Sequence, residues 1–135
     1  MKTSILLITF LCGVYCELYT TEQQVFMKNF VKICQEATNT TTPMLQDFAK
    51  RKYSNDDVLK HFMFCFYKGL GIMKEDGSVD KEAFIKLSES LKDSAKTAAI
   101  TCLDKRGANG PETAFVIAKC YLQGLPENED ASVIL

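Results

Sequence analysis

The chain has 135 residues with 16 basic and 17 acidic side chains, one histidine and six cysteines, and its formal net charge is −1. This length suits one compact domain rather than two, and the 47% of apolar residues can supply a buried core. No basic stripe is present, which argues against a nucleic-acid partner and against binding to an anionic membrane surface.

The N-terminal stretch MKTSILLITFLCGVYC has the pattern of a secretory signal peptide. Lys2 gives a basic start, an apolar run follows, and Val14 and Cys16 occupy the −3 and −1 positions of a cleavage site. The apolar run is too short to span a membrane. We therefore expect a signal peptide at residues 1–16 and a secreted domain at residues 17–135.

The first two expected helices flank a polar loop. Apolar residues recur at helical spacing, and no strand pattern of any weight is present. One helix is expected from about residue 20 to residue 37, with Thr21 and Gln24 placed as a capping box. After the polar run ATNTTT, Thr42 followed by Pro43 is typical of the start of a second helix.

The next two helices are expected on either side of the segment GIMKEDGSV. The third begins at Ser54 or Asn55, has acidic residues in its first turn and ends at Gly69. Asp80 is placed to cap the fourth. The segment between them lacks the oxygen ligands of a calcium-binding loop, so it is interpreted as a turn.

The last two helices complete an all-α domain of about six short helices. The fifth is expected from about Lys92 to Lys105 and carries several alanines. The sixth starts at Pro111 and runs to about Gln123. Its segment AFVIAKCYL is apolar nearly all round, which predicts a central and buried helix.

Removal of the signal peptide leaves four cysteines: Cys34, Cys65, Cys102 and Cys120. An even number in a secreted chain indicates disulfides, and four cysteines allow three pairings. By their positions in the expected helices, Cys34 groups with Cys65 and Cys102 groups with Cys120. Each of these bridges would contribute roughly 3–4 kcal/mol. Metal binding is disfavoured because no CxxC pair and no second histidine are present.

At this point the chain resembles a known family, the insect odorant-binding proteins, which are secreted six-helix carriers with six cysteines. In that family three residues separate the second and third cysteines, and eight separate the fifth and sixth. Counting back from Cys65 and Cys120, these spacings lead to His61 and Pro111. Because these two family cysteines bond to each other, their joint absence resembles the Minus-C subclass, with the bonds Cys34–Cys65 and Cys102–Cys120. The segment GLGIMKEDGSVD also looks like the family's link between helices three and four.

The resemblance implies a compact helical bundle around an apolar cavity and a non-enzymatic carrier with no cofactor. Such a protein reversibly binds small hydrophobic molecules, such as odorants or pheromones, and transports them through extracellular fluid. The implied partners are a small apolar ligand and a chemoreceptor, without nucleic acid or membrane insertion, and the implied state is a monomer or weak homodimer. The alternatives are a secreted helical signalling or defence protein that acts through its surface, and a carrier in reproductive, salivary or venom fluid.

The expected cavity lies among the last three helices and the link that follows the third. Its single polar contact is expected from Tyr121. Val133, Ile134 and Leu135 are expected to fold over the mouth of the cavity or into it, with a frayed and solvated terminus as the alternative. For each residue, ordinary core packing is the alternative. The expected ligand-binding residues are Phe62, Phe66, Leu70, Met73, Phe84, Leu87, Leu91, Ala95, Ala99, Phe115, Ala118, Tyr121, Leu122, Val133 and Ile134.

Two further residues stand out by their type. His61 is expected to be a partly exposed side chain that fills the space left by the missing bridge, with a pH-sensitive contact or a metal ligand as alternatives. Asn39 begins the glycosylation sequon Asn-Thr-Thr in the loop after the first helix. No catalytic residues are expected, because the one histidine cannot be matched to a nucleophile.

Overall fold

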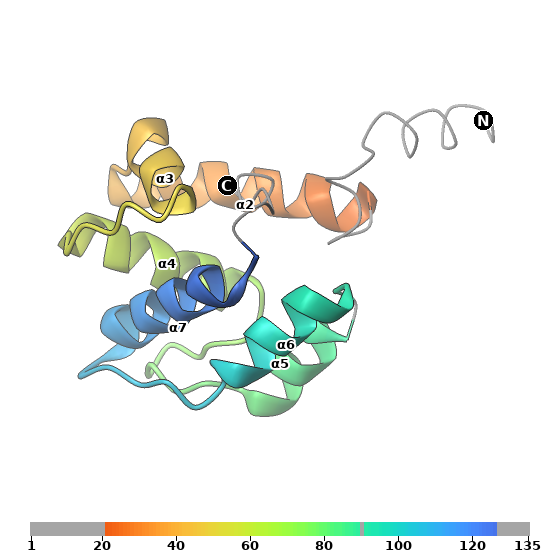
Figure 1. Ribbon diagram of the computed structural model, residues 1–135. Helices are drawn as coiled ribbons and strands as arrows, with labels where there is room; N and C mark the ends of the chain where they lie inside the picture. The colour runs from red at the N-terminus through yellow and green to blue at the C-terminus, as the bar shows by residue number, and fades with distance from the viewer. Residues whose placement is uncertain (1–20, 90, 127–135) are drawn as a thin grey trace, which may run out of the picture.

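The computed structural model describes residues 21–89 and 91–126, which form six helices (Figure 1). The prediction of an all-α domain of about six short helices is confirmed. Beyond the helices, the described residues contain one isolated bridge between Met73 and Val79. The helices are α2 (Thr21–Thr38), α3 (Thr42–Ala49), α4 (Asp57–Gly69), α5 (Lys81–Ser88), α6 (Asp93–Thr101) and α7 (Gly110–Gly124).

The start of α4 corrects the prediction of a cap at Ser54 or Asn55. The carboxylate of Asp56 accepts a hydrogen bond of 2.8 Å from the backbone N–H of Val58, so Asp56 is the N-cap. An acidic cap satisfies an otherwise unpaired N–H group and also suits the positive end of the helix dipole. The helix therefore begins one or two residues later than expected.

The α6 helix is shorter than predicted. It ends at Thr101, and the chain continues through tight turns instead of helix to Lys105. Next in the chain, Asn109 caps α7, because its side-chain oxygen accepts a hydrogen bond of 2.9 Å from the N–H of Glu112. The prediction of a buried sixth helix is confirmed, since residues on several sides of α7 are inaccessible.

Helices α4 and α7 form the central pair of the bundle. Helix α4 packs against α7, α2 crosses the other side of α4, and α6 covers α7 with α5 beside it (Figure 1). Phe62, Leu59 and Ile117 lie at the centre of the core with almost no exposed area. Among the described residues, no helix is both long enough and apolar enough to cross a membrane.

Two disulfides tie these helices together in pairs, as expected for this bundle. Cys34 bonds to Cys65 and joins α2 to α4, and Cys102 bonds to Cys120 and joins the end of α6 to α7. Neither bond crosses the contact between α4 and α7. That contact instead has an ion pair, in which Lys60 Nζ lies 3.8 Å from a carboxylate oxygen of Glu112.

The link between α4 and α5 depends on two glycines with positive φ. Gly71 has φ +80, and Gly77 has φ +88, values that side chains rarely adopt. They differ in their surroundings. A Cβ atom at Gly77 would lie 3.0 Å from the backbone of Gly110, whereas a Cβ at Gly71 would meet nothing within 4 Å.

This difference predicts that Gly77→Ala destabilises the protein more than Gly71→Ala. The Gly71 variant should lose about 1 kcal/mol of unfolding free energy, which is the cost of backbone strain alone. The Gly77 variant should lose more, because the link must also move away from α7. Urea unfolding of both variants measures the difference, and equal losses would contradict the close approach of the link to Gly110.

Candidate ligand-binding cavity

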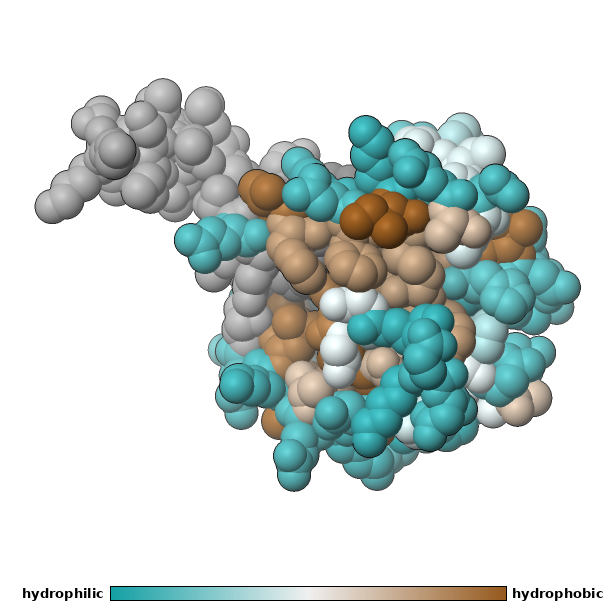
Figure 2. All heavy atoms as spheres, turned by 180° about the vertical axis from the view of Figure 1, so that it is seen from behind, coloured by the Kyte–Doolittle hydropathy of each residue, from teal (hydrophilic) through white to brown (hydrophobic). Residues whose placement is uncertain are grey.

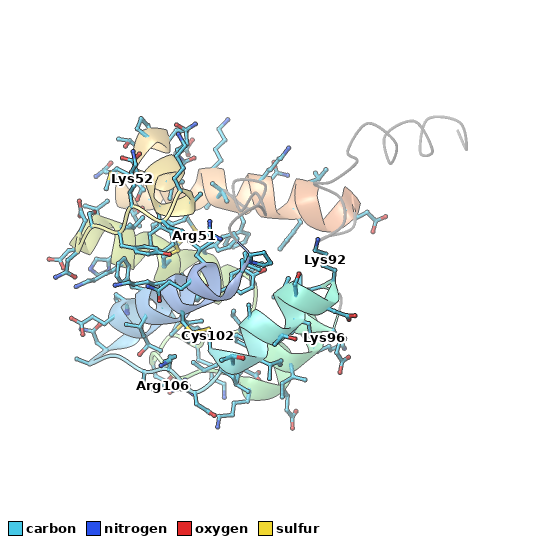
Figure 3. All side chains as sticks on the ribbon, viewed as in Figure 1. Arg51, Lys52, Lys92, Lys96, Cys102 and Arg106 are labelled. Atoms are coloured by element: carbon cyan, nitrogen blue, oxygen red, sulfur yellow. A yellow bond between two sulfur atoms is a disulfide. The ribbon has the colours of Figure 1, made fainter. Side chains whose placement is uncertain are left out.

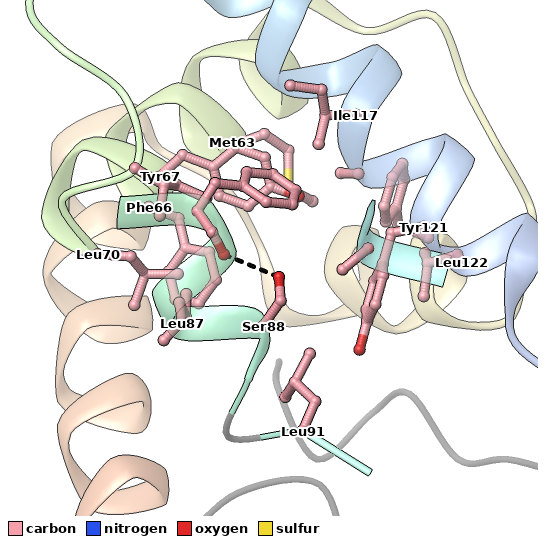
Figure 4. Close-up of a pocket in the computed structure, with 15 residues that line it drawn as sticks. Met63, Phe66, Tyr67, Leu70, Leu87, Ser88, Leu91, Ile117, Tyr121 and Leu122 are labelled. Carbon is pink, nitrogen blue, oxygen red and sulfur yellow. Dashed lines mark hydrogen bonds between the residues drawn. The ribbon is translucent and has the colours of Figure 1, made fainter. Parts of the chain in front are cut away.

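An apolar cavity of about 90 Å³ lies between α4, α5 and α7 (Figure 4). One residue of α3 and one of α6 complete its wall, together with residues from the links around α5. Among the described residues, no lysine, arginine, histidine or carboxylate lines it. The lining residues are Phe48, Met63, Phe66, Tyr67, Leu70, Ile72, Phe84, Leu87, Ser88, Leu91, Ala99, Ile117, Ala118, Tyr121 and Leu122.

The α4 wall follows the helical period. Met63, Phe66, Tyr67 and Leu70 stand at positions i, i+3, i+4 and i+7, which lie on one face of a helix. Phe62 is on the neighbouring face, where it stacks on Phe66 with ring centroids 6.1 Å apart and has no exposed area. The cavity therefore borders the edge of the buried α4 surface rather than its centre.

The α7 wall comes from two adjacent pairs of residues one turn apart. Ile117 and Ala118 form the first pair, and Tyr121 and Leu122 form the second. Phe115 lies earlier in α7, and its ring packs 5.7 Å from that of Phe48, centroid to centroid.

Nine of the predicted ligand-binding residues lie on this wall: Phe66, Leu70, Phe84, Leu87, Leu91, Ala99, Ala118, Tyr121 and Leu122. Four others are buried but do not reach the cavity: Phe62, Met73, Ala95 and Phe115. Phe62, Ala95 and Phe115 lie on helix faces that are buried in the core away from the cavity, and Met73 lies in the link after α4, where it forms an isolated bridge with Val79. Val133 and Ile134, the expected lid, lie outside the described residues.

The sequence analysis missed six lining residues: Phe48, Met63, Tyr67, Ile72, Ser88 and Ile117. The spacing along the helices could have indicated three of them. Met63 and Tyr67 lie on the same face of α4 as Phe66, and Ile117 stands next to Ala118 in α7. Phe48 and Ser88 reach the cavity only through tertiary packing, which no local pattern shows.

Three hydroxyl groups belong to the cavity wall. Ser88 donates a hydrogen bond of 2.8 Å to the backbone carbonyl of Phe84, one turn earlier in α5 (Figure 4). Tyr67 and Tyr121 bring phenols from the facing helices α4 and α7. Burial raises the pKa of Tyr67, and the nearby Tyr121 raises it further, because two phenolates would repel each other.

Arg51 connects α3 to the end of α7 at the edge of the cavity. Its guanidinium donates hydrogen bonds to the carbonyl oxygens of Leu122, Leu125 and Pro126, at distances of 3.1, 3.3 and 3.2 Å (Figure 3). A cation at this place satisfies carbonyl groups that the end of a helix leaves unpaired. Arg51 itself has φ 65, an unusual value for a side-chain-bearing residue, which shows that its position is strongly constrained.

The other singled-out residues lie away from the cavity. His61 is exposed on α4, and its role in filling the space left by the missing bridge stays a prediction. No group of side chains among the described residues could hold a metal ion. Asn39 is exposed at the end of α2 with φ 58, and glycosylation there stays a prediction.

Apolar side chains also reach the outer surface. Val25, Phe26 and Ile33 of α2 are each more than half exposed. The view from behind shows hydrophobic residues gathered over one face, with hydrophilic residues around them (Figure 2). Val25, Phe26 and Ile33 are not among the residues that line the cavity.

The raised pKa of Tyr67 predicts a loss of stability at high pH. In the unfolded chain Tyr67 ionises near pH 10, whereas in the folded protein it keeps its proton to a higher pH. Stability from this group is therefore complete below pH 10 and is lost as the pH rises above it. Urea unfolding at pH 9 and pH 11 should show about 1 kcal/mol less loss for Tyr67→Phe than for the natural protein. Equal losses would mean that Tyr67 ionises normally.

Comparison with known proteins places the chain in a family. The PBP/GOBP family matches residues 16–124. The chain is 31% identical over 105 residues to odorant-binding protein 10 of Aedes aegypti, with 72% of this chain and 71% of that protein covered.

Two solved structures share the fold. Odorant-binding protein dmelOBP28a from Drosophila melanogaster superposes with a TM-score of 0.61 at 19% identity, covering 76% of this chain and 92% of that one. Fatty acid binding protein OBP56a from the oral disk of the blowfly Phormia regina has a TM-score of 0.58 at 23% identity, with coverages of 78% and 94%. Since the family match extends over most of the sequence, from residue 16 to the last residue of α7, the chain belongs to the PBP/GOBP family.

Proposed function

We propose that this protein is a secreted carrier that reversibly binds a small hydrophobic molecule in the cavity between α4, α5 and α7. The observation that carries the proposal is an apolar cavity whose wall, among the described residues, has no charged side chain. Such a site binds by removing apolar ligand surface from water. Membership of the PBP/GOBP family supports the same conclusion.

The size of the cavity indicates that the ligand must open it. A cavity of roughly 150 Å³ can hold benzene, whereas this one measures about 90 Å³. A ligand of a dozen carbons therefore requires movement of the wall. Met63, Leu87 and Leu91 have flexible side chains that can adapt to different guests, and methionine is especially adaptable.

The expected affinity is moderate. Burial of a dozen carbons contributes roughly 10 kcal/mol at about 0.8 kcal/mol for each methylene group. Association costs several kcal/mol or more. The remaining binding free energy is about −8 kcal/mol, which corresponds to a dissociation constant in the micromolar region. This affinity suits a carrier that must also release its ligand.

Filling the cavity tests the proposed function. Ala99 lies on the cavity wall, and Ala98, also buried, packs against Gly124. In Ala99→Leu, the larger side chain should occupy the space of about two ligand methylenes and weaken binding by at least about tenfold. Displacement of a fluorescent apolar probe measures the change.

Ala98→Leu is the matched control. It adds the same atoms at a buried position that does not line this cavity, so it should lower the unfolding free energy by about 1–3 kcal/mol and leave the affinity of the remaining folded protein nearly unchanged. If Ala99→Leu binds the probe as tightly as the natural protein, the cavity is not the binding site.

We also propose cleavage after Cys16 and membership of the Minus-C subclass. The four described cysteines form two disulfides and leave no free thiol among themselves. Cys12 and Cys16 would be removed with the signal peptide. The ion pair Lys60–Glu112 lies next to positions 61 and 111, where the resemblance places the missing bridge.

The intact mass of the secreted protein tests both statements. The expected mass is that of residues 17–135 with two disulfides, and treatment with a thiol reagent under denaturing conditions should add nothing. A mass that includes Cys16, or one added reagent group, would contradict the proposed cleavage and the four-cysteine framework.

A further inference from the structure

The connection between α2 and α3 contains the one Asn-X-Ser/Thr sequon of the chain, Asn39-Thr40-Thr41. Asn39 is exposed, whereas Thr40 is buried with 6% of its area accessible. In a secreted protein, an asparagine that begins such a sequon accepts an oligosaccharide, a bulky group that must stand outside the fold. The surface position of Asn39 meets this spatial requirement.

The backbone at the end of α2 presents Asn39 in an unusual conformation. Asn39 has φ 58, in the left-handed region, and the N–H of Thr40 donates a hydrogen bond of 3.1 Å to the carbonyl oxygen of Gln35. Helices commonly end in this way, and glycine is the usual residue at the left-handed position, with asparagine as the next choice. Unlike glycine, asparagine offers a side-chain amide there.

The fold uses the hydroxyl groups around Asn39 but not its amide. The hydroxyls of Thr38 and Thr40 share a hydrogen bond of 2.6 Å. The hydroxyl of Thr41 accepts a hydrogen bond of 3.3 Å from the N–H of Met44 and caps α3. The amide of Asn39 makes no hydrogen bond to any residue that the structure describes. It is therefore held in solvent and is free to carry a group without breaking a contact.

We propose that Asn39 carries an N-linked oligosaccharide in the secreted protein. In the reaction, the amide nitrogen of Asn39 forms a bond to the anomeric carbon of a lipid-linked oligosaccharide. The bond from that carbon to the pyrophosphate oxygen breaks, the lipid pyrophosphate leaves, and the amide loses one proton to a base of the transferase. This inference rests on the secretion that is part of the proposed function, and it is independent of what the cavity binds.

The contacts of the sequon also determine when the sugar is added. A transferase that recognises the sequon must reach the amide of Asn39 and the hydroxyl of Thr41 together. In the folded protein that hydroxyl caps α3 and Thr40 is buried between them. The oligosaccharide is therefore attached before the connection between α2 and α3 folds, while the chain enters the secretory pathway.

The position of Asn39 keeps the oligosaccharide away from the cavity. The C-terminal end of α2 lies beside α3, far from α5 and α6 (Figure 1). No described side chain of α2 lines the cavity. The sugar thus covers one end of the bundle and leaves ligand binding unchanged.

Asn39→Gly provides the sharpest test. Glycine suits the left-handed φ of this position, so the variant loses the acceptor amide without backbone strain. Both proteins are secreted from insect cells, and the intact mass is measured before and after treatment with a peptide-N-glycosidase. The natural protein should exceed the polypeptide mass of residues 17–135, lose the excess on treatment and retain an aspartate at position 39. Asn39→Gly should show no excess. A secreted natural protein without the excess overturns the proposal.

Two variants of Thr41 separate the sequon from the helix cap. Thr41→Asn keeps a good N-cap but has no hydroxyl, and it creates no new sequon because Pro43 stands two positions later. It should lose the sugar and keep the helical circular dichroism of the natural protein. Thr41→Ser keeps both the hydroxyl and the cap, so it should still be glycosylated. Sugar that persists in Thr41→Asn would show attachment elsewhere and contradict the assignment to Asn39.

Ligand binding and secretion provide two further readouts. The glycosylated protein and Asn39→Gly should bind a fluorescent apolar probe with equal affinity, and a weaker affinity of the glycosylated form would contradict the placement of the sugar away from the cavity. If the chain stays inside the cells without sugar, the proposed secretion fails together with this inference. If it is secreted without sugar, only the glycosylation of Asn39 fails.

Discussion

The packing of α4 against α7 is the contact on which the rest of the structure depends. Each helix is bonded by a disulfide to a different neighbour, α4 to α2 and α7 to α6, so the bundle consists of two cross-linked pairs. Only side-chain packing and the ion pair between Lys60 and Glu112 hold α4 to α7 directly. The cavity lies beside this joint and takes lining residues from both helices. A small shift of one pair against the other can therefore change the cavity without breaking a covalent bond.

The same arrangement explains why a cavity survives in a well-packed core. Large rings such as Phe62 and Phe115 are buried in the core and do not line the cavity. Next to them, Ala99 and Ala118 bring little volume to the wall. Tyr67 and Tyr121 also bring two phenol groups to this otherwise apolar wall.

Much of the fold could be predicted from the sequence because local chemistry determines it. Pro43, which lacks an N–H group, and Asp80, whose side chain caps α5, correctly marked two helix starts, but the cap of α3 is Thr41 and not Thr42 as expected. The grouping of the cysteines followed from their places in the helices. The cap of α4 was placed too early because Ser54, Asn55 and Asp56 are all good caps, and only the three-dimensional structure decides between them.

The cavity was harder to predict than the fold. A helix with apolar residues over a wide arc, such as α4, has no local signal that tells which residue faces a partner helix and which faces an open space. Phe62 and Met63 are adjacent and both buried, yet only Met63 reaches the cavity. Arg51 illustrates the same limit, because its three acceptor groups lie more than 70 residues away in the sequence.

The contacts of Arg51 have a consequence for the direction of the chain. One planar guanidinium holds the carbonyls of Leu122, Leu125 and Pro126 together, so the backbone leaves α7 from a fixed point and at a fixed angle. Leu122 belongs to the cavity wall at that point. The backbone is therefore held as far as Pro126, beside a residue of the cavity wall. One arginine after a two-turn helix thus determines where the chain departs from the bundle at that point.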